Sequence, residues 1–136
     1  MNDTAVNILL VEDDTIDAKA FMRAMAELKF GNDVVLAKDG VEGLEKLQEL
    51  ERPNLVILDI NMPRMNGLEM LRRMREDPKL HDTIVFVLTT SNDDQDKFEA
   101  YNLNVAGYML KSDMGNSFLR AVSLVDHYWK VIEFPN

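Results

Sequence analysis

The sequence predicts an α/β domain built on an open parallel sheet that carries helices on both faces. Five short runs rich in Val, Ile and Leu recur along the chain, and most of them do not alternate with polar residues. Segments with helical spacing of apolar residues separate these runs. Continuous apolar runs are typical of strands buried on both faces, and regular strand–helix alternation favours parallel strands joined by right-handed crossovers.

Five strands and five helices in alternation define the expected topology. The predicted strands are Val6–Val11, Val34–Ala37, Leu55–Leu58, Ile84–Leu88 and Val105–Leu110. We expect the flavodoxin-like arrangement, a (βα)5 doubly wound sheet with strand order 2-1-3-4-5. A closed eightfold barrel would need a chain longer than these 136 residues.

Apolar residues spaced three or four positions apart predict the helices between the strands. They are Phe21, Ala24, Met25 and Leu28; Val41, Leu44 and Leu47; Leu68, Leu71 and Met74; and Phe118, Ala121, Val122 and Val125, with Trp129 one turn further. Polar residues mark the helix boundaries. Asp14 with Thr15 caps the first helix, Asp39-Gly40 precedes the second, Asp77-Pro78 ends the third, and Ser91 or Asn92 caps the fourth.

Composition excludes several classes of function. The formal net charge of −9 argues against nucleic acid as a direct partner, because phosphate backbones attract Lys and Arg. The absence of Cys excludes disulfides and thiolate chemistry, and no apolar run approaches the length needed to cross a bilayer. We expect one domain over residues 1–136 with a short tail at 131–136, no output domain, no membrane partner and a cytoplasmic location.

Polar residues follow each predicted strand at the point where it ends. Glu12 and Asp13 follow the first strand, Asp59 the third, Thr89 the fourth and Lys111 the fifth. Ligands of open parallel sheets bind beyond the carboxyl ends of the strands. With strand order 2-1-3-4-5 the acids of the first and third strands share one crevice, flanked by the fourth strand.

These residue types suit phosphoryl transfer with a divalent cation. Carboxylates from adjacent strands repel each other unless a cation lies between them, and oxygen ligands favour Mg²⁺. Asp13, Asp59 and the main-chain carbonyl of Asn61 can supply three ligands, with Glu12 acting through water. Thr89 offers a hydroxyl and Lys111 a positive charge, while a carboxylate can itself accept a phosphoryl group. Each residue alone has an ordinary explanation as a cap or a loop residue; their joint position carries the prediction.

Four motifs resemble those of a known family. "NILLVED", "VILDINMPRMNG", "VFVLTTS" and "GYMLKS" match, in order, the motifs of the receiver domain of bacterial two-component response regulators. The resemblance covers nearly the whole chain and is strongest to single-domain regulators of the chemotaxis and phytochrome-kinase type.

The resemblance implies a role for each matching residue. Glu12 and Asp13 are the acidic pair, Asp59 is the phosphoacceptor, Asn61 lends its carbonyl to Mg²⁺ (which Mn²⁺ can replace), Thr89 is the switch hydroxyl, Lys111 contacts the phosphoryl group, and Tyr108 is the switch aromatic. The implied donor is a sensor histidine kinase or a histidine phosphotransfer protein. The implied output is a protein contact on the face formed by the fourth helix, fifth strand and fifth helix, and the domain is a signalling protein rather than an enzyme.

The end of the chain carries a further expectation. Apolar residues near a terminus need cover, either from their own domain or from a partner. They are Tyr128, Trp129, Val131, Ile132 and Phe134. We favour a partner surface, with a homodimer through the fourth helix, fifth strand, fifth helix and tail as one form of it.

One residue departs from the family pattern. Ser112 follows the lysine where the family usually has a proline joined by a cis peptide. A cis bond before a non-proline residue costs roughly 3 kcal/mol. The Lys111–Ser112 peptide is therefore either a strained cis bond or a trans bond on a different path, and the reach of Lys111 depends on which.

Four other functions are weighed against the sequence. A metal-dependent hydrolase or nuclease of the Toprim type would favour an Asp-x-Asp pair where this chain has Asp59-Ile60-Asn61. A haloacid-dehalogenase phosphatase would need a double aspartate after the first strand, followed by Thr or Val, and a cap domain. A scaffold that works without phosphorylation would not need Asp59, Thr89 and Lys111 together, and flavin or nucleotide binding lacks a Gly-rich phosphate loop.

Overall fold

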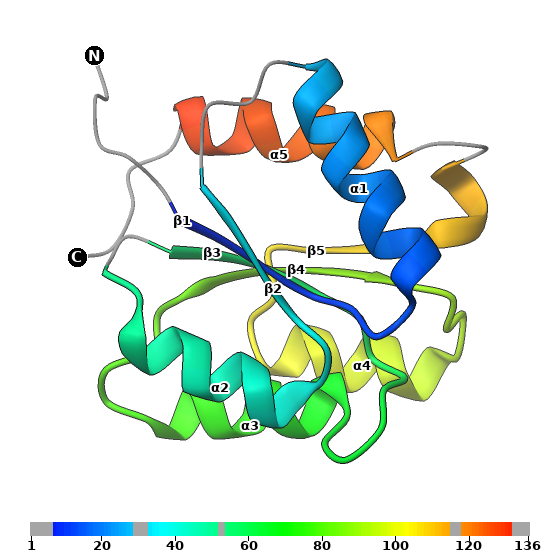
Figure 1. Ribbon diagram of the computed structural model, residues 1–136. Helices are drawn as coiled ribbons and strands as arrows, with labels where there is room; N and C mark the ends of the chain where they lie inside the picture. Colours follow the sequence, from blue (N-terminus) through cyan, green and yellow to red (C-terminus); the bar gives the residue numbers. More distant parts are fainter. Residues whose placement is uncertain (1–6, 29–32, 52–53, 115–117, 132–136) are drawn as a thin grey trace.

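The computed structural model describes residues 7–28, 33–51, 54–114 and 118–131, and these form one sheet with helices on both faces (Figure 1). The elements in chain order are β1 (Asn7–Val11), α1 (Thr15–Glu27), β2 (Val34–Ala37), α2 (Gly40–Glu49), β3 (Asn54–Leu58), α3 (Gly67–Glu76), β4 (Ile84–Thr89), α4 (Asp94–Asn102), β5 (Gly107–Leu110), the 3₁₀ turn η1 (Lys111–Met114) and α5 (Leu119–Val131). The strand order is β2-β1-β3-β4-β5 and every pairing is parallel, which confirms the predicted fold.

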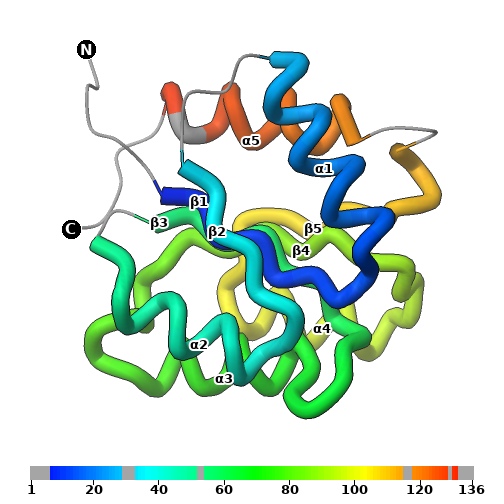
Figure 2. Tube along the Cα trace, viewed as in Figure 1, coloured from blue at the N-terminus to red at the C-terminus, as the bar shows by residue number. Residues whose placement is uncertain are grey.

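The central strands are buried on both faces, which explains their unbroken apolar runs. Figure 1 and Figure 2 show α1 and α5 on one face of the sheet and α2, α3 and α4 on the other. Side chains alternate between the two layers. Ile8 and Leu10 of β1 pack with α1 and α5, whereas Leu9 and Val11 pack with the helices opposite. All five residues of β3 are buried, so β3, which Asp59 follows directly, is the most enclosed strand in the sheet.

Side-chain caps set the helix boundaries. Asp14 and Asp39 cap α1 and α2 as predicted, each accepting a hydrogen bond from a backbone N–H in the first turn. The prediction for the fourth helix is wrong, because α4 begins at Asp94 and its cap is Asp93 rather than Ser91 or Asn92. Asp93 accepts the N–H of Asp96 at 3.0 Å, while the Ser91 hydroxyl donates to the Asp96 carboxylate at 2.6 Å.

Predicted boundaries shift at the fifth strand, the first helix and the fourth strand. The strand begins at Gly107, because Val105 and Ala106 belong to the connection after the turn at Leu103 and Asn104, where Asn104 has a φ of 62°. Leu28 is 43% exposed, because it is the C-cap of α1 rather than part of its buried face. Thr89 closes β4 as its last residue, one position beyond the predicted run.

Part of the predicted partner surface at the chain end belongs to the domain's own core. The ring of Tyr128 lies edge-on to Phe86 with a centroid distance of 4.8 Å. Val131 is 79% exposed. The Trp129 side chain and residues 132–136, with Ile132 and Phe134, lie outside the described residues.

Within the described ranges, none of the helices combines the length and the apolar character that a bilayer crossing demands.

Candidate functional site

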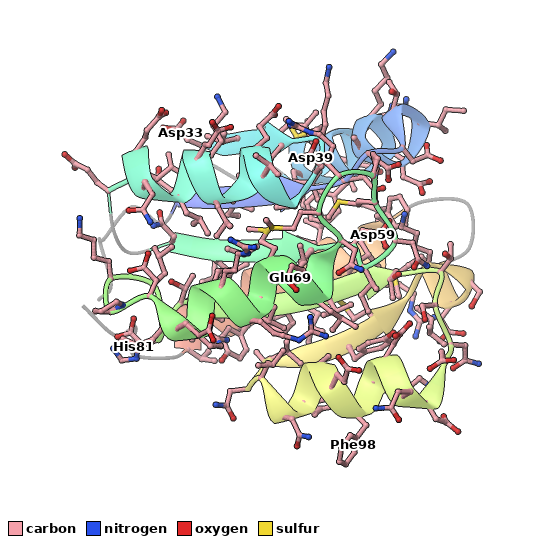
Figure 3. All side chains as sticks on the ribbon, turned by 90° about the horizontal axis from the view of Figure 1, so that it is seen from below. Asp33, Asp39, Asp59, Glu69, His81 and Phe98 are labelled. Atoms are coloured by element: carbon pink, nitrogen blue, oxygen red, sulfur yellow. The ribbon has the colours of Figure 1, made fainter. Side chains whose placement is uncertain are left out.

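Strand register brings the acids of β1 and β3 together. Val11 pairs with Leu58, so Glu12 and Asp59 follow side by side, and the Asp59 N–H donates to the Val11 carbonyl at 3.0 Å. Glu12 and Asp59 are 5% and 6% exposed, whereas Asp13 is exposed. Figure 3 shows Asp59 at the same end of the sheet as Asp39, beneath the loop that leads to α3.

The three predicted acids form one oxygen cluster. Ligand oxygens of Glu12, Asp13 and Asp59 all lie within 4.8 Å of one another. Carboxylate oxygens at such separations suit a hard divalent cation, because a cation offsets their mutual repulsion. Asn61 lies two residues beyond Asp59 in an exposed position of the β3–α3 loop. The donor set therefore fits Mg²⁺ or Mn²⁺.

Lys111 enters this cluster and contacts three carboxylates. Its Nζ lies 2.7 Å from Oε1 of Glu12, 2.7 Å from Oδ2 of Asp17 and 3.1 Å from Oδ2 of Asp59. The lysine side chain is only 9% exposed. Buried charges persist only when they are paired, and here each charge has a partner. Ser112 in place of proline therefore does not prevent Lys111 from reaching the crevice.

Burial and ion pairing act in opposite directions on the pKa of each of these groups. Burial raises the pKa of Glu12 to about 7; the hydrogen bond from Lys111 opposes this rise and the charge of Asp59 adds to it. Burial by itself would lower the pKa of Lys111. Hydrogen bonds to Asp17 and Glu12 and the charge of Asp59 outweigh burial, so the pKa of Lys111 is raised and its ammonium stays charged.

Asp17 is a site residue that sequence reasoning missed. It lies in the first turn of α1 and carries a side chain that is 29% exposed. Its position three residues after the helix cap looked like an ordinary acid at a helix N-terminus, where the dipole favours negative charge. Only the closing of β5 against β4 brings Lys111 to it, so no signal along the sequence could have paired the two.

The β3–α3 loop is held in place by backbone and ionic contacts. The N–H of Gly67 donates to the Ile60 carbonyl at 2.8 Å, and Gly67 packs so closely that a Cβ there would lie 2.1 Å from the Asp59 carbonyl oxygen. Arg64 has a φ of 60° and makes two hydrogen bonds to the Asp39 carboxylate, at 2.7 and 3.1 Å. This hydrogen-bonded pair lowers the pKa of Asp39. The loop that carries Asn61 is thus anchored at both ends.

Thr89 and Tyr108 meet at the β4–α4 loop. Thr89 is fully buried, and its hydroxyl accepts the N–H of Ser91 at 3.3 Å. The Tyr108 hydroxyl donates to the Ser91 carbonyl at 2.8 Å, and burial raises the pKa of this tyrosine. Tyr108 thus contacts the loop rather than the acids. The backbone of Ser91 therefore links the Thr89 hydroxyl to the Tyr108 hydroxyl.

The parallel sheet is open and five-stranded, and its carboxyl edge holds a cluster of acids beside a buried lysine. This arrangement defines a class of domains suited to accepting a phosphoryl group. The family model of the response regulator receiver domain matches residues 8–122. The chain belongs to this family.

Known relatives are similar to this chain over nearly its full length. The response regulator Rcp1 of Synechocystis sp. is 30% identical over 128 residues, which cover 90% of this chain and 87% of Rcp1. The phosphorylated cyanobacterial phytochrome response regulator RcpA superposes with a TM-score of 0.86 at 32% identity, covering 98% of this chain and all of RcpA. The Mn²⁺-bound form of Rcp1 superposes with a TM-score of 0.84 at 29% identity, covering 96% and 99%.

The protein is accordingly a receiver domain of two-component signalling. Phosphorylation that is read out on the surface of α4, β5 and α5 is the standard mechanism of this family, which is a family of signalling proteins.

Proposed function

We propose that Asp59 is the phosphoacceptor and receives its phosphoryl group from a phosphohistidine on a sensor histidine kinase or a histidine phosphotransfer protein. The observation that carries this proposal is the contact of buried Asp59 with Lys111 at 3.1 Å, beside Glu12 and Asp13 in one oxygen cluster. A lone structural aspartate would not need a buried lysine and two further acids around it.

The transfer conserves atoms and charge. A carboxylate oxygen of Asp59 attacks the phosphorus of a phosphohistidine whose second ring nitrogen carries a proton. The P–N bond breaks and its electron pair stays on the ring nitrogen, so the imidazole leaves as a neutral group. The product is an acyl phosphate on Asp59 and an unphosphorylated histidine on the donor. Lys111 donates hydrogen bonds to the phosphoryl oxygens, which carry charge of about −2. Burial excludes water from the crevice and strengthens these contacts.

Mg²⁺ is the proposed cofactor, and Mn²⁺ can replace it. Glu12, Asp13, Asp59 and the main-chain carbonyl of Asn61 would hold the ion, whose chemical contribution is to neutralise the phosphoryl oxygens during transfer. The oxygen cluster supports this assignment.

Thr89 and Tyr108 are the proposed switch. New phosphoryl oxygens at Asp59 attract the Thr89 hydroxyl, which then releases the N–H of Ser91. The Ser91 carbonyl is the acceptor of Tyr108, so a moved loop frees the tyrosine to turn. Differential contacts of this kind shift the balance between two existing states of the α4–β5–α5 face.

Output passes through that face to a downstream protein target. Phe98 and Tyr101 of α4 are 62% and 54% exposed, and Figure 3 shows Phe98 pointing away from the sheet. Exposed aromatic rings on an otherwise polar helix suit a protein contact. A homodimer through α4, β5, α5 and the tail at 131–136 is one such contact. We further propose that the protein acts in the cytoplasm as a signalling protein without catalytic turnover of its own.

The decisive experiment is incubation with Mg²⁺ and phosphoramidate, read by intact mass. Wild-type protein gains the mass of one phosphoryl group, and Asp59→Asn gains none. The matched control Asp33→Asn alters an exposed aspartate just before β2, at the opposite end of the sheet from Asp59 (Figure 3), and is phosphorylated like wild type. A wild type that never gains mass contradicts the proposed function.

Gel filtration with and without beryllofluoride tests the proposed dimer. Unchanged elution at high protein concentration would exclude it.

A further inference from the structure

Lys111 has more partners than the transfer of a phosphoryl group requires. An ammonium group has three N–H donors, and the carboxylates of Glu12, Asp17 and Asp59 supply three acceptors within 3.1 Å. Two of these acceptors, Glu12 and Asp59, belong to the oxygen cluster that suits a divalent cation. Asp17 does not belong to that cluster.

The lysine and a divalent cation therefore compete for the same oxygens. A cation bound by Glu12 and Asp59 draws on the two carboxylates that hold Lys111 from β1 and β3. A buried ammonium that loses both acceptors must find another or leave the crevice, because an unpaired charge is costly there. Asp17 is the acceptor that serves Lys111 alone.

The first turn of α1 holds Asp17 in position to accept from Lys111. Its N–H donates to the Asp14 carboxylate at 3.0 Å, which holds the first turn of α1 in place. Its own carboxylate reaches Lys111 across 94 residues of sequence. The contact is therefore a link between α1 and the end of β5, made at the edge of the crevice rather than at its centre.

We propose that Asp17 is a positioning residue that keeps the Lys111 ammonium in the crevice when Glu12 and Asp59 bind the divalent cation. Asp17 holds the lysine ready for the phosphoryl group and reduces its competition with the cation. This role rests on the proposed function of Asp59, and it assigns a second task to the first turn of α1 beyond capping.

The first test is the affinity for Mg²⁺ measured by calorimetry on three variants. Asp17→Asn removes one charge and leaves Lys111 on Glu12 and Asp59, so the dissociation constant for Mg²⁺ rises roughly fivefold. Asp17→Glu keeps the charge and restores most of the affinity. Glu27→Gln, at the far end of α1, makes the same change in net charge and shifts the constant by less than about twofold. Equal affinities for wild type and Asp17→Asn overturn the proposal.

The second test observes the lysine itself by ¹⁵N NMR of its ammonium group. A buried, hydrogen-bonded ammonium exchanges slowly with water and gives a signal. In wild type the Lys111 signal persists when Mg²⁺ is added, because Asp17 still accepts from it. In Asp17→Asn the signal is present without Mg²⁺ and is lost when Mg²⁺ saturates the site. A signal that persists in both proteins overturns the proposal.

Phosphorylation by phosphoramidate at saturating Mg²⁺ separates this inference from the function on which it rests. Wild type that accepts phosphate several-fold faster than Asp17→Asn supports both. Wild type and Asp17→Asn that react at equal rates refute the role of Asp17 and leave Asp59 as the phosphoacceptor. A wild type that takes up no phosphate refutes the proposed function itself.

Discussion

The crevice at the ends of β1 and β3 and the outer face of α4 differ in how their side chains are held. In the crevice, Lys111 is 9% exposed and contacts three carboxylates. On α4, Ala100 is the only buried residue, while Phe98 and Tyr101 are more than half exposed. The first region holds desolvated charges in fixed places, as chemistry at an anion requires. The second is weakly packed, so changing its conformation or its partners costs little.

The largest effect is expected from breaking the buried charge network. Lys111→Met leaves Glu12, Asp17 and Asp59 without their cation, and should lower the free energy of unfolding by about 4 kcal/mol at pH 8. Urea denaturation measures this loss. Lys130→Met is the control, because Lys130 is 57% exposed in its pair with Asp126 and should cost less than about 0.5 kcal/mol. Equal losses for the two lysines would contradict the contrast between buried and exposed charge.

The pH dependence of stability tests the cost of burying the Glu12 charge in the crevice. The folded-state pKa of Glu12 is raised from 4.5 to about 7, so its contribution to stability is complete below pH 4.5 and is lost as pH rises through 7. Glu12→Gln resembles the protonated form and lacks this loss. Unfolding of the two proteins should differ little at pH 4.5, and the variant should be more stable by about 3 kcal/mol at pH 8. Parallel stability curves of the two proteins from pH 4.5 to 8 would show that folding does not raise the pKa of Glu12.

A third effect concerns the backbone that supports the crevice. Gly67→Ala places a methyl group 2.1 Å from the Asp59 carbonyl oxygen, and backbone cannot yield as a side chain does. We expect a loss of about 2 kcal/mol in the free energy of unfolding and slower phosphorylation. At Gly107 the nearest atom is a ring carbon of Phe86 at 3.2 Å, so Gly107→Ala should lower the free energy of unfolding clearly less than Gly67→Ala does. Thermal denaturation of the two variants measures this difference. A larger loss for Gly107→Ala than for Gly67→Ala would contradict the close contact between Gly67 and the Asp59 carbonyl.

The smallest effect on stability is expected on α4. Phe98→Ser removes a ring that is 62% exposed and should change the free energy of unfolding by less than about 0.5 kcal/mol. Its effect should appear instead in the interaction with a partner. If the protein dimerises with beryllofluoride, gel filtration of Phe98→Ser should show a weaker dimer. An unaltered dimer would remove Phe98 from the proposed interface.

Much of the fold followed from local patterns. The unbroken apolar runs of β1, β3 and β4 predicted strands buried on both faces, and Asp14 and Asp39 marked the starts of two helices. The cap of α4 did not follow, because Ser91, Asn92 and Asp93 are all good capping residues and periodicity cannot choose among them. The choice depends on where the Ser91 side chain is engaged, which is a tertiary contact.

The positions of Glu12, Asp59, Thr89 and Lys111 at one edge were determined by the sequence, because each ends an apolar run and parallel strands end on the same side of a sheet. Only the tertiary structure decided which of these groups touch. The contact of Asp17 with Lys111, the pair of Arg64 with Asp39 and the bond from Tyr108 to Ser91 join elements that are distant along the chain. Such contacts depend on the reach and direction of individual side chains, which neither spacing nor composition encodes.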